Sequence, residues 1–344
     1  MNDLTLLWDI TQRCNLSCIH CYNALKRGEN ISPSVRSDYE AIIDRSEEMG
    51  VNHIHLLGGE PFVIQNLLDI IDYASRRGIT VTVNTNGTML SQPIIDSIVS
   101  SQLSQITISI DGGTAEDNDY IRGDGTFDVV IKGLCALMHT IKERNSSIQV
   151  QIATVVTQIN AKRLHFLPRI LKELGIHYLA VMRLYETGNA LINQKELQID
   201  EGEWLSAVVR LLIEAYRHRI ILNIDCKPYV MAWIRKRYGF TVEAQSSFAS
   251  CQAGKKILYL DERNYIFPCG PMASSLCCGT VNSIFDENPV GTILVSSLPV
   301  IPPSYSVCTH CDYRDQCSWC PACSKHSADL CQYIFEHYSR GSDI

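Results

Sequence analysis

The sequence lacks any apolar run long enough to cross a membrane and any long run of basic residues. A helix needs about 20 consecutive apolar residues to span a bilayer, and no stretch of the 344 residues supplies them. The N-terminus also lacks the basic and then apolar segments of a secretory signal. With a formal net charge of −7, the chain shows no electrostatic footprint for nucleic acid. These absences predict a cytoplasmic location and neither a membrane nor a nucleic-acid partner.

Cysteine, by contrast, is abundant. The chain has 15 cysteines, and without a secretory signal we expect them in a reducing compartment, where metal ligation is commoner than disulfide formation. Hydrophobic residues make up 46% of the sequence, which is enough for a sizeable core. A chain of this length suits one large domain plus one small domain.

Three cysteines are closely spaced just after the first strand-like run. Cys14, Cys18 and Cys21 form a Cys-x3-Cys-x2-Cys pattern, and three thiolates on one loop suit three corners of a 4Fe–4S cubane. The fourth iron then stays open to a small molecule. A zinc site is the alternative, but structural zinc normally has four ligands. His20 as the fourth ligand would make a cramped chelate between Cys18 and Cys21.

The first half of the chain alternates strand-like and helix-like patterns. The strand-like apolar runs are 4–10, 52–57, 80–84, 105–110, 149–154 and 178–182. The helix-like segments between them are 34–49, 64–77, 93–101, 127–144 and 162–174. This alternation predicts an α/β fold with parallel strands and right-handed crossovers. In such folds, ligands bind at the carboxyl ends of the strands.

Polar motifs occupy the ends of the second, third and fourth strand-like runs. They are Gly58-Gly59-Glu60-Pro61, Asn84-Thr85-Asn86-Gly87 and Ser109-Ile110-Asp111-Gly112, with Arg122 after the last. Glycine, asparagine and aspartate are ordinary turn residues, so each motif alone indicates little. A glutamate, two asparagines and a serine at the same edge of the sheet favour a ligand site.

The cysteine triplet and these motifs, in this order, resemble the radical S-adenosylmethionine (SAM) superfamily over residues 4–184. The resemblance implies a partial (β/α)6 barrel of the TIM type, in which the three cysteines hold a 4Fe–4S cluster whose open iron binds SAM. It also implies reductive cleavage of SAM to a 5′-deoxyadenosyl radical, which abstracts hydrogen from a substrate.

The resemblance further implies which residues contact SAM. We expect the SAM amino group to be bound by Gly58, Gly59, Glu60 and Pro61, and the SAM carboxylate by Ser109 and Arg122. The ribose or methionyl part should contact Asn84, Asn86 and Asp111. The adenine should lie near Tyr22. Arg183 ends the sixth strand-like run and is a further candidate, for which a salt bridge at the rim is the alternative.

The pattern changes after residue 184. Residues 203–219 read as an amphipathic helix and 221–224 as a short strand, and 256–260 and 265–267 flank a turn and predict a hairpin. We therefore expect a barrel at 1–184, a bridging helical region at 185–250 and a cysteine-rich domain at 251–344. We expect that last segment to need metal in order to fold, because 308–331 lacks a compact hydrophobic periodicity.

The cysteine-rich end resembles the SPASM extension of radical SAM enzymes, which holds two auxiliary iron–sulfur clusters. The family pattern is matched by Cys251, Asn264-x4-Cys269, Cys308-x2-Cys311-x5-Cys317-x2-Cys320 and Cys331. Asn264 stands where the family has glycine, and asparagine tolerates a positive φ better than most residues. A pair of zinc knuckles is the alternative, and it would leave the protein colourless.

The same resemblance divides the ligands between the two clusters. One closed cluster takes Cys308, Cys311, Cys317 and Cys331, and the other takes Cys251, Cys269 and Cys320. The fourth ligand of the second cluster stays open among Cys226, Cys277, Cys278 and an unfilled position, and Cys323 competes with Cys331. Cys135 lies in a helix-like apolar run, which predicts a small buried hydrophobe.

The resemblance implies a substrate class less sharply than it implies cofactors. The cofactors are three 4Fe–4S clusters and SAM, with an electron donor such as flavodoxin or ferredoxin as partner. Gly270 follows Cys269, where sulfatase maturases of the family have an aspartate as base, and this argues against that branch. The first strand-like run begins at residue 4, so we expect that a ribosomal peptide substrate needs either a separate carrier protein or direct recognition.

We therefore expect modification of a ribosomally made peptide, such as a cross-link. Modification of a small molecule, for example a porphyrin precursor, is the alternative within the same class. A non-catalytic electron carrier or a zinc-knuckle scaffold is the alternative outside it, and the set of SAM motifs speaks against both.

Overall fold

The computed structural model of the chain describes residues 4–24, 39–225, 228–239, 245–246, 252–270, 282–286 and 329–338. The strands in these ranges are β1 (Leu4–Asp9), β2 (Val51–Leu57), β3 (Thr80–Thr85), β4 (Gln105–Ser109), β5 (Gln149–Val155), β6 (Tyr178–Met182), β7 (Ile221–Ile224), β8 (Gln245–Ser246), β9 (Ile257–Leu260), β10 (Tyr265–Phe267) and β11 (Asn282–Ser283). The six strand-like runs of the first half are confirmed.

The described helices follow the predicted alternation and add to it. They are α1 (Tyr39–Glu48), α2 (Leu67–Arg76), α3 (Gln92–Ser100), α4 (Ala115–Arg122), α5 (Thr126–Glu143), α6 (Leu167–Leu174), α7 (Asn189–Ile192), α8 (Gln194–Leu197), α9 (Glu201–His218), α10 (Pro228–Tyr238) and α13 (Asp329–Tyr338), with short 3-10 turns at Pro61–Val63 and Leu164–Phe166. The sequence patterns did not predict α4, α7, α8, α10 or α13. Among the helices of the described ranges, none is both long and apolar enough to cross a bilayer.

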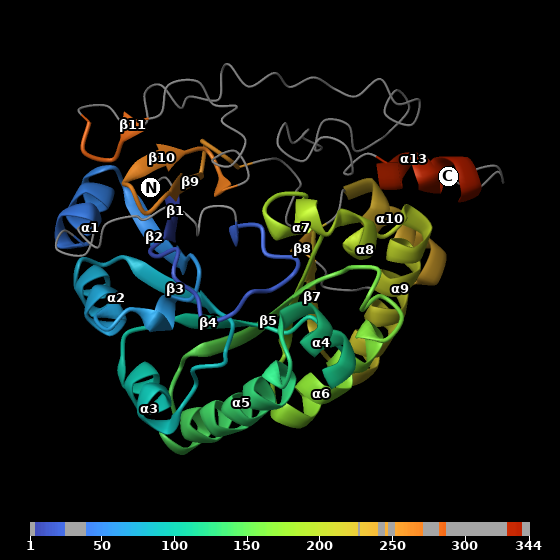
Figure 1. Cartoon of the computed structure of the whole chain (residues 1–344), viewed down its shortest axis with the longest axis horizontal. Helices are drawn as coiled ribbons and strands as arrows, with labels where there is room; N and C mark the ends of the chain where they lie inside the picture. The colour runs from blue at the N-terminus through green and yellow to red at the C-terminus, as the bar shows by residue number, and fades with distance from the viewer. Residues whose placement is uncertain are drawn as a thin grey trace.

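All described strands join one sheet in the order β11-β10-β9-β1-β2-β3-β4-β5-β6-β7-β8. The strands from β1 to β8 pair in parallel. The sheet curves into an arc with α2, α3, α5, α6 and α9 on its outer side (Figure 1). This arrangement confirms the α/β class and places the ends of β2, β3 and β4 at one rim.

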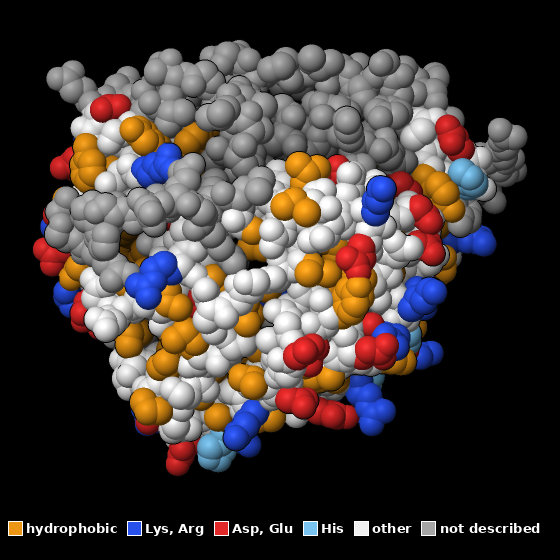
Figure 2. Space-filling view, viewed as in Figure 1, with side chains coloured by type: hydrophobic (Ala, Val, Ile, Leu, Met, Phe, Trp, Pro, Cys, Tyr) orange, Lys and Arg blue, Asp and Glu red, His pale blue; other side chains and the backbone are white. Residues whose placement is uncertain are grey.

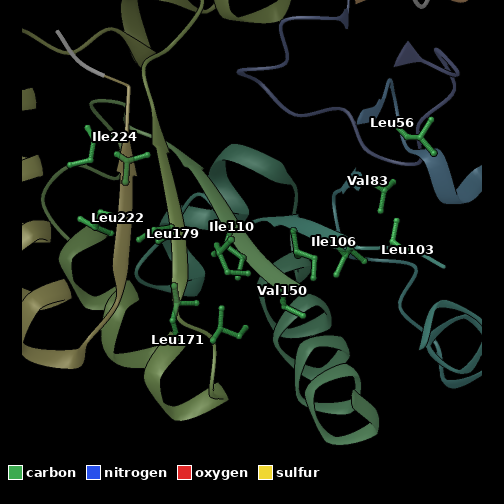
Figure 3. Packing of buried hydrophobic residues seen from close by; sticks show 14 of the residues in the cluster. Leu56, Val83, Leu103, Ile106, Ile110, Val150, Leu171, Leu179, Leu222 and Ile224 are labelled. Carbon is green, nitrogen blue, oxygen red and sulfur yellow. The ribbon is translucent and has the colours of Figure 1, made fainter. Parts of the chain in front are cut away.

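The alternation of side chains along each strand gives the sheet an apolar face and a polar face. Ile54, Val83, Ile106 and Leu222 lie on the helix-facing side and are at most 1% exposed, and Figure 3 shows such residues packed between the strands and the helices. Burying one such side chain stabilises the fold by about 1.5–3 kcal/mol. The opposite face carries polar residues, because side chains alternate between the two faces of a strand.

The sheet extends beyond the six strands of the predicted barrel. β7 and β8 follow β6 on one side, and β9 pairs in parallel with β1 on the other, with Leu7 opposite Tyr259. β9 and β10 form the predicted hairpin, and Asn264 in its turn has a φ of 68°. The hairpin that begins the cysteine-rich segment is therefore continuous with the barrel sheet.

The prediction for Cys135 is wrong, because this side chain is exposed. Helix α5 buries Val130, Leu134 and Leu137. Each residue turns the helix by about 100°, since there are 3.6 residues per turn. The residue directly after Leu134 therefore points away from the core.

Charged side chains of both signs are interspersed over the described part of the face seen in Figure 2. Several form surface ion pairs, such as Arg144 with Asp96 and Arg163 with Glu116. Exposed pairs of this kind contribute at most about 1 kcal/mol each. The stability of the fold therefore rests mainly on the apolar layer between sheet and helices.

Candidate active site

The cysteine loop follows β1 and lies at the carboxyl end of the strands. The Cys14 sulfur accepts hydrogen bonds from the Leu16 amide at 3.5 Å and from Asn86 Nδ2 at 3.8 Å. The Cys18 sulfur is buried and lies 3.9 Å from the Arg122 carbonyl oxygen. Burial raises the pKa of the Cys18 thiol to about 11, so a metal that binds there must displace a proton.

Residues of this loop fit a cluster better than a zinc ion ligated by His20. His20 Nε2 lies 3.0 Å from Asp111 Oδ2, so this ring nitrogen is paired with a carboxylate. Within the described ranges, no three His, Cys, Asp or Glu side chains surround a single metal-ion position. A cubane differs from such a site because its cysteines bind separate irons, and N–H groups beside Cys14 suit a thiolate ligand.

The two glycines of the first motif seat the cysteine loop on the sheet. The Gly59 amide donates to the Thr11 carbonyl at 2.6 Å, and the Glu60 amide donates to the Arg13 carbonyl at 2.8 Å. A Cβ on Gly59 would lie 2.2 Å from the Arg13 oxygen, and one on Gly58, whose φ is +131°, 2.3 Å from the Thr11 oxygen. Only glycine allows this approach, so the pair has a structural reason that the sequence did not reveal.

Glu60 ties the end of β2 to the end of β3. Its carboxylate is 0% exposed and accepts from the Phe62 amide at 3.1 Å, Thr85 Oγ1 at 2.7 Å and the Asn86 amide at 2.7 Å. Burial raises the pKa of Glu60, although these donors oppose the rise. Both carboxylate oxygens face protein donors, so the contact with the SAM amino group that we expected stays a prediction. Pro61 follows as the first residue of a 3-10 turn.

The two asparagines of the second motif have different surroundings. Asn86 Nδ2 donates to Asn15 Oδ1 at 2.8 Å, so its amide holds the cysteine loop. Asn84 Oδ1 is buried and has no hydrogen-bond partner of good geometry among the described residues, with His55 beside it. A buried acceptor of this kind is costly unless a ligand satisfies it. The expected contact of either asparagine with the ribose or methionyl part of SAM stays a prediction.

Asp111 joins three parts of the rim. Its carboxylate lies 2.6 Å from Arg122 Nη2 and 3.0 Å from His20 Nε2, and it accepts from the Val155 amide at 2.7 Å. Burial alone would raise the pKa of Asp111, but Arg122 and His20 outweigh it and hold that pKa well below its usual range. The carboxylate is fully buried by these groups. In this structure Asp111 therefore orients Arg122, and its expected contact with the ribose or methionyl part of SAM stays a prediction.

Arg122 is the last residue of α4 and is 9% exposed. Thr114 caps the start of α4 by accepting from the Asp117 amide, and Gly123 follows with a φ of 125°. Arg122 Nε is buried without a hydrogen-bond partner among the described residues. The guanidinium is thus held on one side by Asp111 and has an unused donor on another. Ser109, the other residue expected at the SAM carboxylate, ends β4.

Arg183 and Tyr22 were also expected near SAM. Arg183 forms a two-pronged ion pair with Glu201 at 3.0 and 2.8 Å, and its guanidinium stacks 4.2 Å from the Trp204 ring. The salt-bridge alternative therefore describes Arg183. Tyr22 follows Cys21 in the loop, and burial together with the charge of Asp9 raises its pKa.

Sequence reasoning missed a segment that holds the cysteine loop. Around α7, the Asn189 amide donates to the Cys21 carbonyl and Asn189 Nδ2 to the Cys18 carbonyl, both at 2.9 Å. Asn193 Nδ2 donates to the Ile19 carbonyl at 2.9 Å. A Cβ on Gly188 would lie 2.4 Å from the Cys21 oxygen. A glycine followed by asparagines four residues apart was the available signal.

The face of the sheet opposite the helices is polar below the rim. The strand register places Thr107 beside Asn84 and beside Gln151, and Thr82 beside His55. Gln105 Nε2 donates to Gln151 Oε1 at 2.7 Å. Burial and the neighbouring His53 lower the pKa of His55 to about 4. We call Thr82, Asn84, Thr107 and Gln151 the inner wall.

Most cysteines of the second half lie outside the described residues. These are Cys226, Cys251, Cys277, Cys278, Cys308, Cys311, Cys317, Cys320 and Cys323. Cys269 follows the hairpin and is partly buried, and Cys331 is buried on α13 beside Ile334 in the core. The division of ligands between two auxiliary clusters stays a prediction.

Comparisons with known proteins agree with this geometry. The model of the Radical SAM superfamily matches residues 8–163. An AdoMet-dependent heme synthase from Methanosarcina barkeri is 26% identical over 274 residues, covering 77% of this chain and 76% of that protein. The mycofactocin maturase MftC from Mycobacterium tuberculosis is 32% identical over 161 residues, covering 47% of this chain and 40% of MftC.

A solved structure shares the fold. Native anSMEcpe with bound AdoMet and the Kp18Cys peptide superimposes with a TM-score of 0.69 at 17% sequence identity, covering 97% of this chain and 96% of that chain. The arc of parallel strands is thus the predicted partial barrel. With their cysteine loop, their strand-end motifs and the match to the family model, residues 8–163 of the chain belong to the radical SAM superfamily.

Proposed function

We propose that this radical SAM enzyme modifies a peptide, with a cross-link or a similar bond as the product. When bound, SAM and a reduced 4Fe–4S cluster supply a 5′-deoxyadenosyl radical that abstracts hydrogen from a C–H bond. Cys14, Cys18 and Cys21 hold the cluster in this proposal. Two further clusters, an external electron donor and a substrate-carrying partner belong to the same proposal.

Arg122 is the residue that we assign to the SAM carboxylate. Its buried Nε–H has no hydrogen-bond partner among the described residues, and its backbone carbonyl lies beside the Cys18 sulfur. A guanidinium suits a carboxylate because it presents several donors in one plane. Asn84 Oδ1 supplies an acceptor at the same rim. Glu60 and Asn86 support the site by fixing the end of β3 and the cysteine loop.

The observation that carries the peptide assignment is the inner wall. Its amide and hydroxyl side chains come from neighbouring strands in register, and each such group both donates and accepts hydrogen bonds. A peptide backbone offers the complementary carbonyl and N–H groups. MftC is a maturase, and anSMEcpe is known with a bound peptide, which supports the same substrate class.

A small-molecule substrate is the second candidate. The relative aligned over 77% of this chain is a heme synthase, and this favours a tetrapyrrole precursor. A tetrapyrrole presents a flat apolar ring with carboxylates, so its recognition depends on cations and apolar contacts more than on amides.

The test uses anaerobically reconstituted full-length protein, SAM and dithionite. We expect 5′-deoxyadenosine to form, and we expect deuterium to move into it from a perdeuterated candidate peptide substrate. Iron-coproporphyrin serves as the competing probe. Deuterium transfer from the porphyrin alone would replace the peptide assignment with the second candidate. Absence of 5′-deoxyadenosine with intact clusters would contradict the proposed reaction itself.

A further inference from the structure

A buried hydrogen bond joins the start of the fold to the cysteine-rich segment. The Tyr259 hydroxyl on β9 donates to Asp9 Oδ2 at the end of β1, across 250 positions of sequence. Asp9 is 0% exposed and Tyr259 is 1% exposed. Polar groups buried this deeply need hydrogen-bond partners. The directional bond between them fixes the relative position of β1 and β9 more sharply than apolar contact does.

On one side, Asp9 reaches the cysteine loop. Asp9 is the last residue of β1, and Asn23 Nδ2, two residues after Cys21, donates to the same Oδ2 atom at 2.9 Å. Asn23 is 1% exposed. The carboxylate therefore holds both the strand that leads into the cysteine loop and the segment that leaves it.

On the other side, Tyr259 reaches the segment around Cys269. Its ring centroid lies 6.2 Å from that of Phe267, two residues before Cys269. A Cβ on Gly270 would lie 3.2 Å from the Tyr259 ring, so the backbone directly after Cys269 passes close to the ring. A side chain at Gly270 would make this contact tighter than ordinary packing, so the ring or the backbone would have to shift by a few tenths of an ångström.

We propose that the Asp9–Tyr259 contact positions the Cys269 hairpin relative to the cysteine loop and transmits ligand binding at the loop to the hairpin. The inference rests on the proposed function, because SAM is the ligand that it names. A ligand that orders the loop also orders Asn23, and Asn23 and Tyr259 bond the same carboxylate oxygen. Coupling between two sites through a shared, buried contact needs no larger rearrangement.

Tyr259→Phe is the main variant, because it removes the hydroxyl and keeps the ring against Gly270. Tyr265→Phe is the matched control, since Tyr265 lies on the same hairpin but is 41% exposed. Asp9→Asn keeps an oxygen that accepts from Tyr259, whereas Asp9→Leu removes it. The measurement is amide hydrogen exchange followed by mass spectrometry, on metal-free protein and on reconstituted protein with and without SAM.

In metal-free protein we expect Tyr259→Phe to speed exchange in Ile257–Leu260 by up to about tenfold, because one net hydrogen bond is lost. In reconstituted wild-type protein we expect SAM to slow exchange in this strand. Tyr259→Phe and Asp9→Leu should lose that slowing, Tyr265→Phe should keep it, and Asp9→Asn should restore most of it.

Two results would overturn the inference. One is an equal SAM effect in wild-type and Tyr259→Phe proteins, and the other is an Asp9→Asn variant that behaves like Asp9→Leu. SAM binding itself is checked by the change in the electron paramagnetic resonance signal of the reduced cluster. If SAM leaves that signal unchanged in wild-type protein, the proposed function fails, and the metal-free comparison still decides the positioning role.

Discussion

Arg122 Nη2 lies 2.6 Å from Asp111 Oδ2, and the two side chains are 9% and 0% exposed. Neither charge is tolerable alone at this depth, because burying an unpaired ion costs several kcal/mol. His20 and the Val155 amide contact the same carboxylate. Asp111 is thus the point at which the cysteine loop, α4 and β5 are joined, and Arg122 is its counter-ion.

Replacing Asp111 by Ala should destabilise the metal-free protein by about 3–5 kcal/mol, since it leaves the Arg122 charge buried and unpaired. Asp96→Ala is the control, because its pair with Arg144 is exposed and should cost at most about 1 kcal/mol. Urea unfolding measures both. The Asp111→Ala, Arg122→Met double variant should lose less than the two single changes together, and strict additivity would contradict the pairing.

Because His55 is buried, we expect the folded protein to lose stability in mild acid. Burial, together with His53, lowers its folded-state pKa to about 4, from an ordinary value of 6.5. Below pH 6.5 the unfolded chain binds a proton at His55 that the folded chain excludes, so stability falls as the pH drops from 6.5 towards 4. The loss reaches roughly 3 kcal/mol at most, at 1.36 kcal/mol per unit of pKa.

The check for His55 is the difference between wild-type protein and His55→Gln in urea unfolding at a series of pH values. Glutamine does not titrate, so its stability should fall less steeply between pH 6.5 and pH 4, and other ionisable groups cancel in the comparison. His139→Gln serves as the control, because His139 is exposed. Parallel curves for wild-type and His55→Gln proteins would show that His55 protonates freely in the fold.

The elements and motifs that depend on short stretches of sequence could be predicted from the sequence alone. Strands β1 to β6 follow from alternating apolar runs, and the rim follows from parallel pairing, which brings strand ends together. The positive φ of Asn264 was also predictable, because the turn chemistry is local. The exposed position of Cys135 was not, since the apolar run alone did not reveal which face of α5 is buried.

Partnerships between distant residues could not be predicted in the same way. The motifs placed Glu60 and Asp111 at the rim, but the fold turns both carboxylates towards protein donors. Asn189 and Tyr259 contact the cysteine loop or its supporting strand from positions far along the chain. Such contacts depend on where β9 and α7 are packed, and one sequence pattern does not contain that information.

Changing Cys14, Cys18 and Cys21 to Ala should remove one cluster and leave the others. By cubane stoichiometry, we expect iron to fall from about twelve to about eight per chain, with loss of SAM cleavage. Cys135→Ala is the matched control, because Cys135 is exposed on α5 and outside every predicted ligand set. Iron and sulfide analysis after anaerobic reconstitution measures the change. A colourless wild-type protein with stoichiometric zinc would contradict the cluster assignment for the loop and the tail alike.

Gly59→Ala should prevent the cysteine loop from binding its cluster, although no cysteine is changed. The added Cβ would lie 2.2 Å from the Arg13 carbonyl oxygen, so the loop must move away from β2. We expect about four fewer irons per chain and no change in the electron paramagnetic resonance signal on addition of SAM. Gly78→Ala is the control, because its φ of +77° is strained for alanine but its Cβ meets no atom within 4 Å. That variant should cost about 1–2 kcal/mol in stability and keep its iron. Full iron loading in Gly59→Ala would show that the close seating of the loop on the glycine pair is not needed for cluster binding.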